Sequence, residues 1–259
     1  MKLLLIKTGD TLPAIKQRFG DFDDWFLAAF GASRPVHQLI QVHREESLPT
    51  DLADIDGALV TGSPAMVSHR LPWSERTAGW LAEAHQAGLP MLGVCYGHQL
   101  IAHALGGEVG PNPAGRRIGT RELEVCEPDD PLLGALTALH PPRVQVTHSE
   151  AVLSPPPGAR VIAHAQGDAH HALYFGGNSW GLQFHPEFDR AIMHAYLVER
   201  RADILAEGLD YGALAESLAE APLGPAVLAR FLALIAGPEG AASTVTNSNT
   251  QSKDRAASP

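Results

Sequence analysis

The sequence predicts an α/β protein whose open, mostly parallel sheet is flanked by helices and extended by added antiparallel strands. Two observations predict this class. In the first half, short and wholly apolar segments alternate with segments of helical periodicity, which is typical of a parallel sheet covered on both faces. In the second half, several strand-like segments follow one another across short turns, which indicates antiparallel pairing.

The strands expected in the first half are short and apolar, and each is followed by a turn or a helix. They are KLLLIKTG, VHQLIQVH, GALVTGS and LPMLGV, at residues 2–9, 36–43, 57–63 and 89–94. The expected helices are AIKQRFGDFDDWFLAAFG, WSERTAGWLAEAHQAG and GHQLIAHALGG, at residues 14–31, 73–88 and 97–107. In the second of these helices Trp73, Trp80 and Leu81 recur at helical spacing, and Gly88 is expected to cap its end.

The second half is expected to hold four strand segments and two helices. The strands are GRRIGTRELEV, RVQVTHSEAV, ARVIAHA and HALYFGGNSWGLQF, the last with a turn at GGNS, and the helices span about residues 190–207 and 225–236. From Gly237 the chain is polar and poor in large apolar groups, so residues 237–259 are expected to be a disordered tail. Residues 1–236 are expected to form a single domain.

Composition excludes several classes of protein. The 259 residues include 19 basic and 29 acidic ones, a formal net charge of −10, and no basic block, which argues against a surface for nucleic acid or for an anionic membrane. The two cysteines indicate no disulfide framework and favour a reducing, cytoplasmic location. The apolar run at the N-terminus is too short for a signal-peptide core, and no segment is long enough to cross a bilayer.

Cys95 lies where the strand LPMLGV meets the helix GHQLIAHAL. The pattern Gly93-Val94-Cys95-Tyr96-Gly97 has the form of a nucleophile elbow, in which a sharp turn lifts the central residue to the carboxyl edge of the sheet. The helix N-terminus favours a thiolate at Cys95, and the backbone N–H of Tyr96 becomes a candidate oxyanion donor. Cys126, in LEVCEP, has no such context and is interpreted as structural.

A thiol nucleophile needs a base, and SWGLQFHPEF provides the best one among the 13 histidines. An apolar strand delivers His185 at its end, and Glu187 follows two residues later, where it can bond the far imidazole nitrogen. Cys95, His185 and Glu187 therefore follow the logic of nucleophile, base and orienting acid.

Two further features of the sequence have both a functional and an ordinary structural interpretation. Gly62 and Ser63, in the turn VTGSP after the third strand, are a candidate second oxyanion donor and a candidate substrate contact. His164, His170 and His171 are close in sequence, but their spacing matches no metal signature and no cysteine lies nearby, so we expect no metal site.

Taken together, GVCYGHQ, LQFHPE, VTGSP and VTHSEAV resemble the class I glutamine amidotransferase family of the triad type, with the match clearest over residues 57–188. The resemblance looks closest to the glutaminase domain of GMP synthase and its stand-alone relatives. It implies a flavodoxin-like sheet and no bound cofactor. It also implies that Cys95 attacks the glutamine side-chain amide, that Gly62 and Tyr96 hold the oxyanion, and that Gln99, His148 and Ser149 help to bind the substrate.

The resemblance leaves the partner and the substrate open. The chain carries no SGGxDS-type phosphate loop, so complete GMP synthesis is not expected. The chain either feeds ammonia to a separate synthetase or hydrolyses a γ-glutamyl compound by itself, as γ-glutamyl peptidases do. An idle or partner-gated regulatory subunit is a third hypothesis. An α/β hydrolase or a redox-sensing protein is a fourth, which does not explain His185-Pro186-Glu187. The wall that separates glutamine from larger substrates is expected in the loop at residues 66–73.

Overall fold

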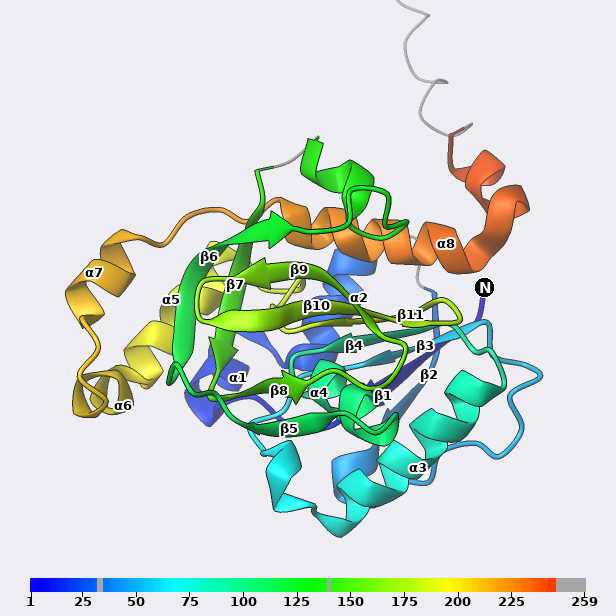
Figure 1. The fold of residues 1–259 in the computed structure, drawn as a ribbon, viewed down its shortest axis with the longest axis horizontal. Helices are drawn as coiled ribbons and strands as arrows, with labels where there is room; N and C mark the ends of the chain where they lie inside the picture. Colours follow the sequence, from blue (N-terminus) through cyan, green and yellow to red (C-terminus); the bar gives the residue numbers. More distant parts are fainter. Residues whose placement is uncertain (32–34, 139–140, 246–259) are drawn as a thin grey trace, which may run out of the picture.

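The computed structural model describes residues 1–31, 35–138 and 141–245, and within it one sheet runs through both halves of the chain (Figure 1). In these residues the sheet has nine strands in the order β2-β1-β3-β4-β11-β10-β9-β6-β7. The strands from β2 to β11 pair in parallel, and those from β11 to β7 pair antiparallel. The fold class expected from the sequence is therefore confirmed.

The strand bounds follow the expected segments, with differences in the second half. The strands are β1 (Leu3–Lys7), β2 (Val36–Gln41), β3 (Gly57–Val60), β4 (Met91–Val94), β5 (Glu108–Pro111), β6 (Arg117–Val125), β7 (Arg143–His148), β8 (Glu150–Ser154), β9 (Arg160–Ala165), β10 (Asp168–Gly176) and β11 (Ser179–Leu182). The single strand expected at residues 143–152 is wrong, because the chain turns at Ser149 and β8 leaves the main sheet to pair with β5. Strand β5 was not expected from the sequence.

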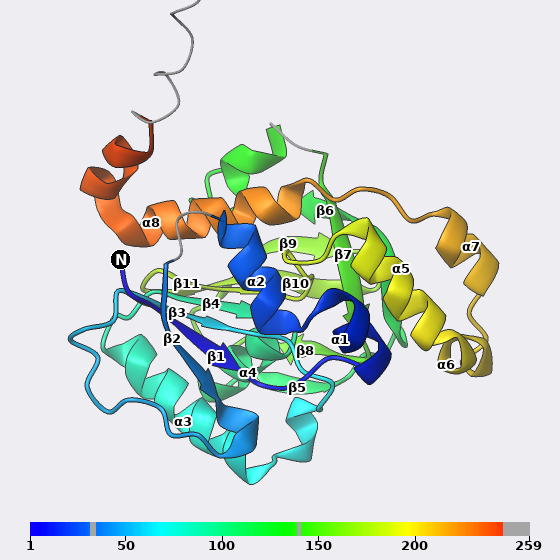
Figure 2. The same ribbon diagram turned by 180° about the vertical axis from the view of Figure 1, so that it is seen from behind.

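The helices cover both faces of the sheet. They are α1 (Pro13–Phe19), α2 (Phe22–Phe30), α3 (Pro72–Gln86), α4 (Tyr96–Ala104), α5 (Arg190–Glu199), α6 (Arg201–Ala206), α7 (Tyr211–Glu216) and α8 (Leu223–Val245), with 3-10 turns at Val42–Arg44, Val67–His69 and Gly134–Ala138. Helices α3 and α4 lie on one face, and α2 and α8 lie on the other (Figures 1 and 2). Helix α7 was not expected from the sequence.

Two helices that we expected to be continuous are each divided. At residues 14–31, Gly20 has φ +83° and Asp21 caps a new helix through a capping box with Asp24, so α1 ends and α2 begins. At residues 190–207, Arg200 takes a non-helical conformation (φ −96°, ψ 9°) between α5 and α6. Both expectations of a single helix were wrong.

The end of the described chain also differs from the expectation. Helix α8 begins at Leu223, and Gly237, with φ +69°, kinks it where the tail was expected to start. The backbone is helical again to Val245, so the boundary expected after residue 236 is a kink within helical structure. The rest of the expected tail, residues 246–259, lies outside the described residues.

The core lies on both faces of the parallel strands. Leu3 and Leu5 of β1 pack on one face with α2 and α8, whereas Leu4 and Ile6 pack on the other face with α3 and α4. Burial on both faces is why these strands are wholly apolar in sequence. A third cluster joins α1, α2, α5 and α6 beyond the carboxyl ends of the strands. Among the described residues, no helix has the length and apolar composition needed to cross a membrane.

Candidate active site

The carboxyl ends of β3, β4 and β11 meet at one edge of the sheet because these strands pair in parallel. Gly62 follows β3, Cys95 follows β4 and His185 follows β11. A Cβ built on Gly62 would lie 2.9 Å from His185 Cε1 and 3.7 Å from Cys95 Cβ, so the three residues are in close contact. Parallel pairing therefore gathers residues that are between 33 and 123 positions apart in sequence.

Cys95 occupies the strained turn that its glycine neighbours predict. Its backbone has φ 50° and ψ −101°, its N–H donates to Leu182 O at 2.8 Å, and helix α4 begins at the next residue. A Cβ on Gly97 would approach Val60 O to 2.4 Å, and one on Gly93 would approach Gly97 O to 2.5 Å. A side chain at either position would thus collide with backbone, which explains why the elbow requires both glycines.

The imidazole of His185 is fixed by one hydrogen bond and by contacts with two aromatic rings. Its Nδ1 bonds Glu187 Oε1 at 2.8 Å, and both side chains are buried. Its ring stacks on Phe188, with centroids 4.0 Å apart, and faces Phe22 at 6.2 Å. Nδ1 is occupied by Glu187, so Nε2 is the nitrogen left for chemistry; no hydrogen-bond partner is present for it among the described residues.

Electrostatics favour a positively charged His185. Burial alone would lower the pKa of this imidazole, but the negative charges of Glu187 and Cys95 outweigh it and raise the pKa to about 10. Near neutral pH the imidazole therefore carries a proton that it can give to a leaving group.

The backbone around Gly62 is fixed by hydroxyl groups. Thr8 Oγ1 donates to Thr61 O at 3.0 Å and to Gly62 O at 2.9 Å, and Gly97 N also donates to Thr61 O. Tyr96 is the first residue of α4, so its N–H has no intrahelical acceptor. Both amides are placed as candidate oxyanion donors next to Cys95.

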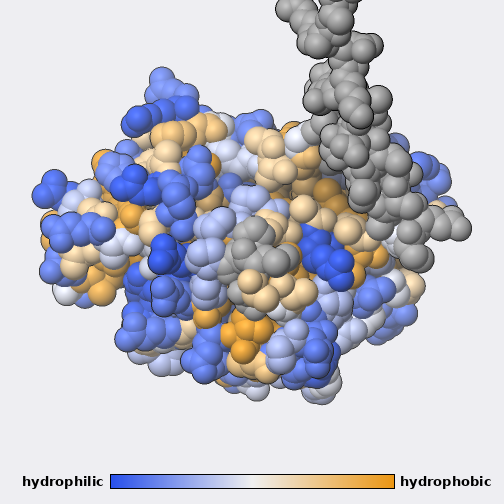
Figure 3. Space-filling view, turned by 90° about the horizontal axis from the view of Figure 1, so that it is seen from above, coloured by the Kyte–Doolittle hydropathy of each residue, from blue (hydrophilic) through white to orange (hydrophobic). Residues whose placement is uncertain are grey.

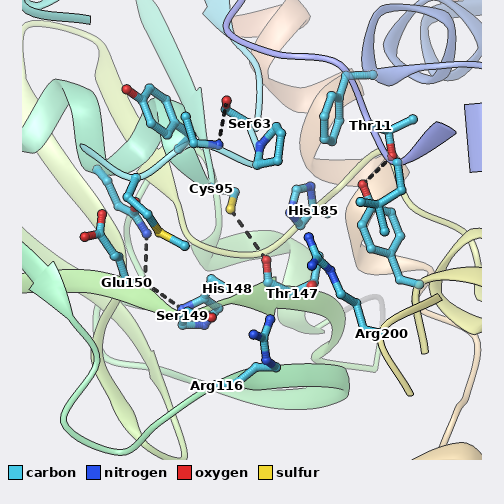
Figure 4. Close-up of a pocket in the computed structure, with 18 residues that line it drawn as sticks. Thr11, Ser63, Cys95, Arg116, Thr147, His148, Ser149, Glu150, His185 and Arg200 are labelled. Carbon is cyan, nitrogen blue, oxygen red and sulfur yellow. Dashed lines mark hydrogen bonds between the residues drawn. The ribbon is translucent and has the colours of Figure 1, made fainter. Parts of the chain in front are cut away.

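A pocket surrounds the thiol (Figure 4). It is lined by Thr11, Leu12, Phe22, Ser63, Pro64, Ala65, Met66, Cys95, Tyr96, Gln99, Arg116, Thr147, His148, Ser149, Glu150, His185, Tyr196 and Arg200. Of the loop at residues 66–73, in which we expected the wall, only Met66 is among these lining residues.

The expected substrate contacts line this pocket, but several of their polar atoms are already engaged. Ser63 Oγ donates to Thr8 O at 2.9 Å, and Gln99 Nε2 donates to Glu150 O at 2.8 Å and to Gln183 Oε1 at 2.9 Å. The Nδ1 of His148 lies 2.8 Å from Glu150 O, and its other nitrogen faces Asp168. Ser149 lies at the corner between β7 and β8 and lines the pocket.

Several residues of the site were not expected from the sequence. Thr147 O lies 3.8 Å from Cys95 Sγ, and Thr11 bonds the hydroxyl of Tyr196 at 2.6 Å. Arg116 and Arg200 point into the pocket from the loop before β6 and from the end of α5 (Figure 4). VTHSEAV could have indicated Thr147, whereas the others come from segments without a motif.

The fold and site define an α/β protein that sets a nucleophile-elbow cysteine opposite a buried His–Glu pair. Its sequence matches the profile of the glutamine amidotransferase class-I family over residues 27–203, and the chain belongs to that family. It is thus an enzyme of the glutamine amidotransferase and hydrolase type.

Individual relatives agree with this assignment. The chain is 39% identical over 133 residues to a GMP synthase of Aeropyrum pernix, a match that covers 51% of this chain and 24% of that protein. It is 24% identical over 184 residues to gamma-glutamyl peptidase 3 of Arabidopsis thaliana, covering 69% of this chain and 74% of that protein. A glutamine amidotransferase structure from Thermotoga maritima superposes with a TM-score of 0.68 at 19% identity, covering 90% of this chain and 96% of that one. The chain thus spans about a quarter of the GMP synthase that it matches.

Proposed function

We propose that the protein hydrolyses the side-chain amide of glutamine through a γ-glutamyl thioester on Cys95. The observation that carries the proposal is the close approach of Gly62, Cys95 and His185 at one sheet edge, with His185 Nδ1 held by Glu187. Nucleophile, oxyanion donor and base are then within reach of one carbonyl group.

The chemistry follows from these positions. Cys95 Sγ attacks the amide carbon, and the oxyanion that forms accepts hydrogen bonds from the N–H groups of Gly62 and Tyr96. His185 Nε2 gives its proton to the nitrogen as the C–N bond breaks, so ammonia leaves and the thioester remains. Water then attacks the thioester, His185 takes the water proton, and glutamate is released while the thiol is restored.

The fate of the ammonia is a second part of the proposal. The matched GMP synthase is named as glutamine-hydrolysing, and the present chain corresponds to about a quarter of it. We propose that a synthetase receives the ammonia.

A second candidate function is hydrolysis of γ-glutamyl compounds that are larger than glutamine. The leaving group departs on the side of His185, because His185 protonates it, and on that side Figure 4 places Arg200, with Arg116 below it. Arg116 is already paired with Glu207 and Arg200 with Asp203, so a carboxylate on the leaving group would share these guanidinium groups with the two acids. The similarity to gamma-glutamyl peptidase 3 supports this candidate.

The test is ammonia, amine and glutamate release by the isolated protein on glutamine, γ-glutamylglycine and γ-glutamylglycinamide. We expect turnover that Cys95→Ala reduces by about 10³-fold or more. Cys126→Ala is the matched control, because that cysteine is exposed and does not line the pocket. Full activity of the Cys95→Ala protein would refute the mechanism. Preference for γ-glutamylglycine over its amide would favour the second candidate function. No activity on any of the substrates would favour the hypothesis of a partner-gated or idle subunit.

A further inference from the structure

A second group of ionisable side chains is buried beside the active site. His148 ends β7, and Asp168 and His171 lie at the start of β10. Their side chains are 2%, 2% and 1% exposed. One possible ligand atom from each lies within 4.8 Å of the others. The spacing of histidines along the chain could not indicate this group, because His148 joins it from a different strand.

The hydrogen bonds of this group leave two acceptors facing each other. His148 Nδ1 lies 2.8 Å from the carbonyl oxygen of Glu150, so Nδ1 carries the proton and Nε2 carries a lone pair. That Nε2 has no hydrogen-bond partner among the described residues and lies 3.7 Å from Asp168 Oδ2, which is also an acceptor. Two acceptor atoms this close together in a buried place repel each other unless a cation or a donor lies between them.

Asp168 also lacks a strong positive partner. Its Oδ1 accepts from the N–H of His170 and its Oδ2 contacts His171 Nδ1 at 2.9 Å, but no lysine or arginine of the described chain forms an ion pair with it. Buried carboxylates are normally paired with a cation or bound to a metal.

We propose that His148 Nε2, Asp168 Oδ2 and His171 Nδ1 bind a divalent transition-metal ion of the zinc class. A tetrahedral zinc ion with bonds of about 2.0–2.2 Å separates its ligand atoms by about 3.3–3.6 Å. The distances of 2.9 Å and 3.7 Å from Asp168 Oδ2 to the two nitrogens bracket this separation. Two imidazoles and one carboxylate are a ligand set that such ions accept, with water as the fourth ligand. The proton of His171 then resides on Nε2.

The ion has a structural role next to the active site. It satisfies Asp168 and fixes the imidazole of His148, and thereby the corner at Ser149 and Glu150 that lines the catalytic pocket. It does not touch Cys95, so the proposal does not depend on the proposed reaction.

Zinc binding to the full-length Cys95→Ala protein tests the proposal, because this background removes the competing thiol of the active site. After treatment with a chelator, Zn²⁺ is titrated against a chromophoric indicator, and bound metal is counted by elemental analysis. We expect one equivalent per chain, and an affinity lowered by about tenfold or more in Asp168→Asn and in His171→Gln. His164→Gln is the matched control, since His164 lies on β9 with its side chain 40% exposed. Far-UV circular dichroism of the metal-free variants checks that they fold.

Three results would overturn the proposal. They are failure of the Cys95→Ala protein to take up zinc, equal zinc affinity in the folded Asp168→Asn variant, and loss of affinity in His164→Gln to the same degree. Cobalt provides an independent readout. A thiolate charge-transfer band in the wild type, with no cobalt retained by Cys95→Ala, would place the metal at the catalytic cysteine and would also overturn the proposal.

Discussion

At the scale of single residues, the charge on His185 is the property on which the proposed chemistry depends. Burial disfavours the imidazolium, and the charges of Glu187 and Cys95 restore it, so the pKa rises to about 10. The imidazolium is present below that pKa and is lost as the pH rises through it. We therefore expect the kcat/KM of the wild type to fall on the alkaline side near pH 10.

Glu187→Gln removes one of the two charges that raise the pKa of His185. The expected result is an alkaline limb at lower pH and a kcat about 10²–10⁴-fold below that of the wild type, because the amide no longer stabilises the imidazolium. Histidine ¹⁵N NMR titration of both proteins measures the pKa directly. Glu124→Gln, at an exposed glutamate, is the control. An unchanged pKa of His185 in Glu187→Gln would show that Glu187 does not set it.

The motifs predicted which residues meet, but not what holds them. Cys95, His185 and Gly62 follow apolar strands, and parallel strands bring their carboxyl ends together, so their approach could be expected from sequence. The stacking of Phe22 on His185 could not, because it depends on where α2 begins. His148 was expected to contact substrate, yet the hydrogen bond of its Nδ1 turns the other nitrogen toward Asp168.

At the scale of elements, a buried lysine connects β1 to the start of α2. Lys7 Nζ lies 2.9 Å from Asp10, 2.7 Å from Asp21 and 2.7 Å from Asp23, and its side chain is 4% exposed. Burial opposes the charge, but the three carboxylates raise the pKa of Lys7 well above its ordinary value. Asp21 also caps α2, so this network fixes the helix that carries Phe22.

Lys7→Met leaves the carboxylates of this network without their central cation. We expect a loss of about 3–5 kcal/mol in the free energy of unfolding at pH 7, measured by urea denaturation. The loss should shrink at lower pH, where protonation of the carboxylates relieves their repulsion. Lys16→Met is the matched control, because Lys16 contacts the same Asp21 but is 43% exposed, and it should cost about 1 kcal/mol or less. Equal losses in the two variants would contradict a special role for Lys7.

Helix and strand boundaries were the part of the fold least accessible from sequence. The apolar spacing of Phe22, Phe26 and Phe30 continues that of α1, so periodicity alone suggested one helix across Gly20. The break depends on the capping box of Asp21 and on its ion pair with Lys7, which is a tertiary contact. Similarly, β7 and β8 were expected to be one strand, because the apolar pattern does not show that β8 pairs with β5.

At the scale of the whole molecule, the mixed sheet places the antiparallel half beside the catalytic edge. The backbone N–H of His185 donates to Gln145 O of β7 at 2.8 Å, and Thr147 O of the same strand lies beside the thiol. The antiparallel strands thereby form one wall of the pocket, and the catalytic residues follow the parallel strands. This continuity supports our proposal that residues 1–236 act as one domain.

The C-terminal helix α8 completes the core on the far side of this sheet. An apolar helical segment such as residues 225–236 can serve either core packing or a partner surface. In the structure Val227, Leu228 and Phe231 are fully buried, and the Phe231 ring meets Trp180 of β11 edge-on at 6.4 Å. The face seen from the side of α8 mixes hydrophobic and hydrophilic residues (Figure 3). Core packing therefore accounts for these side chains.

Phe231→Ala tests whether α8 stabilises the whole molecule or only its own surface. Removing a buried phenylalanine leaves a cavity against Trp180, so we expect a loss of about 3–5 kcal/mol and a decrease in Tm of about 6–20 °C. Glutamine hydrolysis measured well below the Tm should change little, because Phe231 does not line the catalytic pocket. Leu205→Ala is the control, since that side chain is exposed and its loss should leave the Tm nearly unchanged. A normal Tm for Phe231→Ala would mean that α8 is held loosely, and the partner-surface interpretation of residues 225–236 would then be favoured.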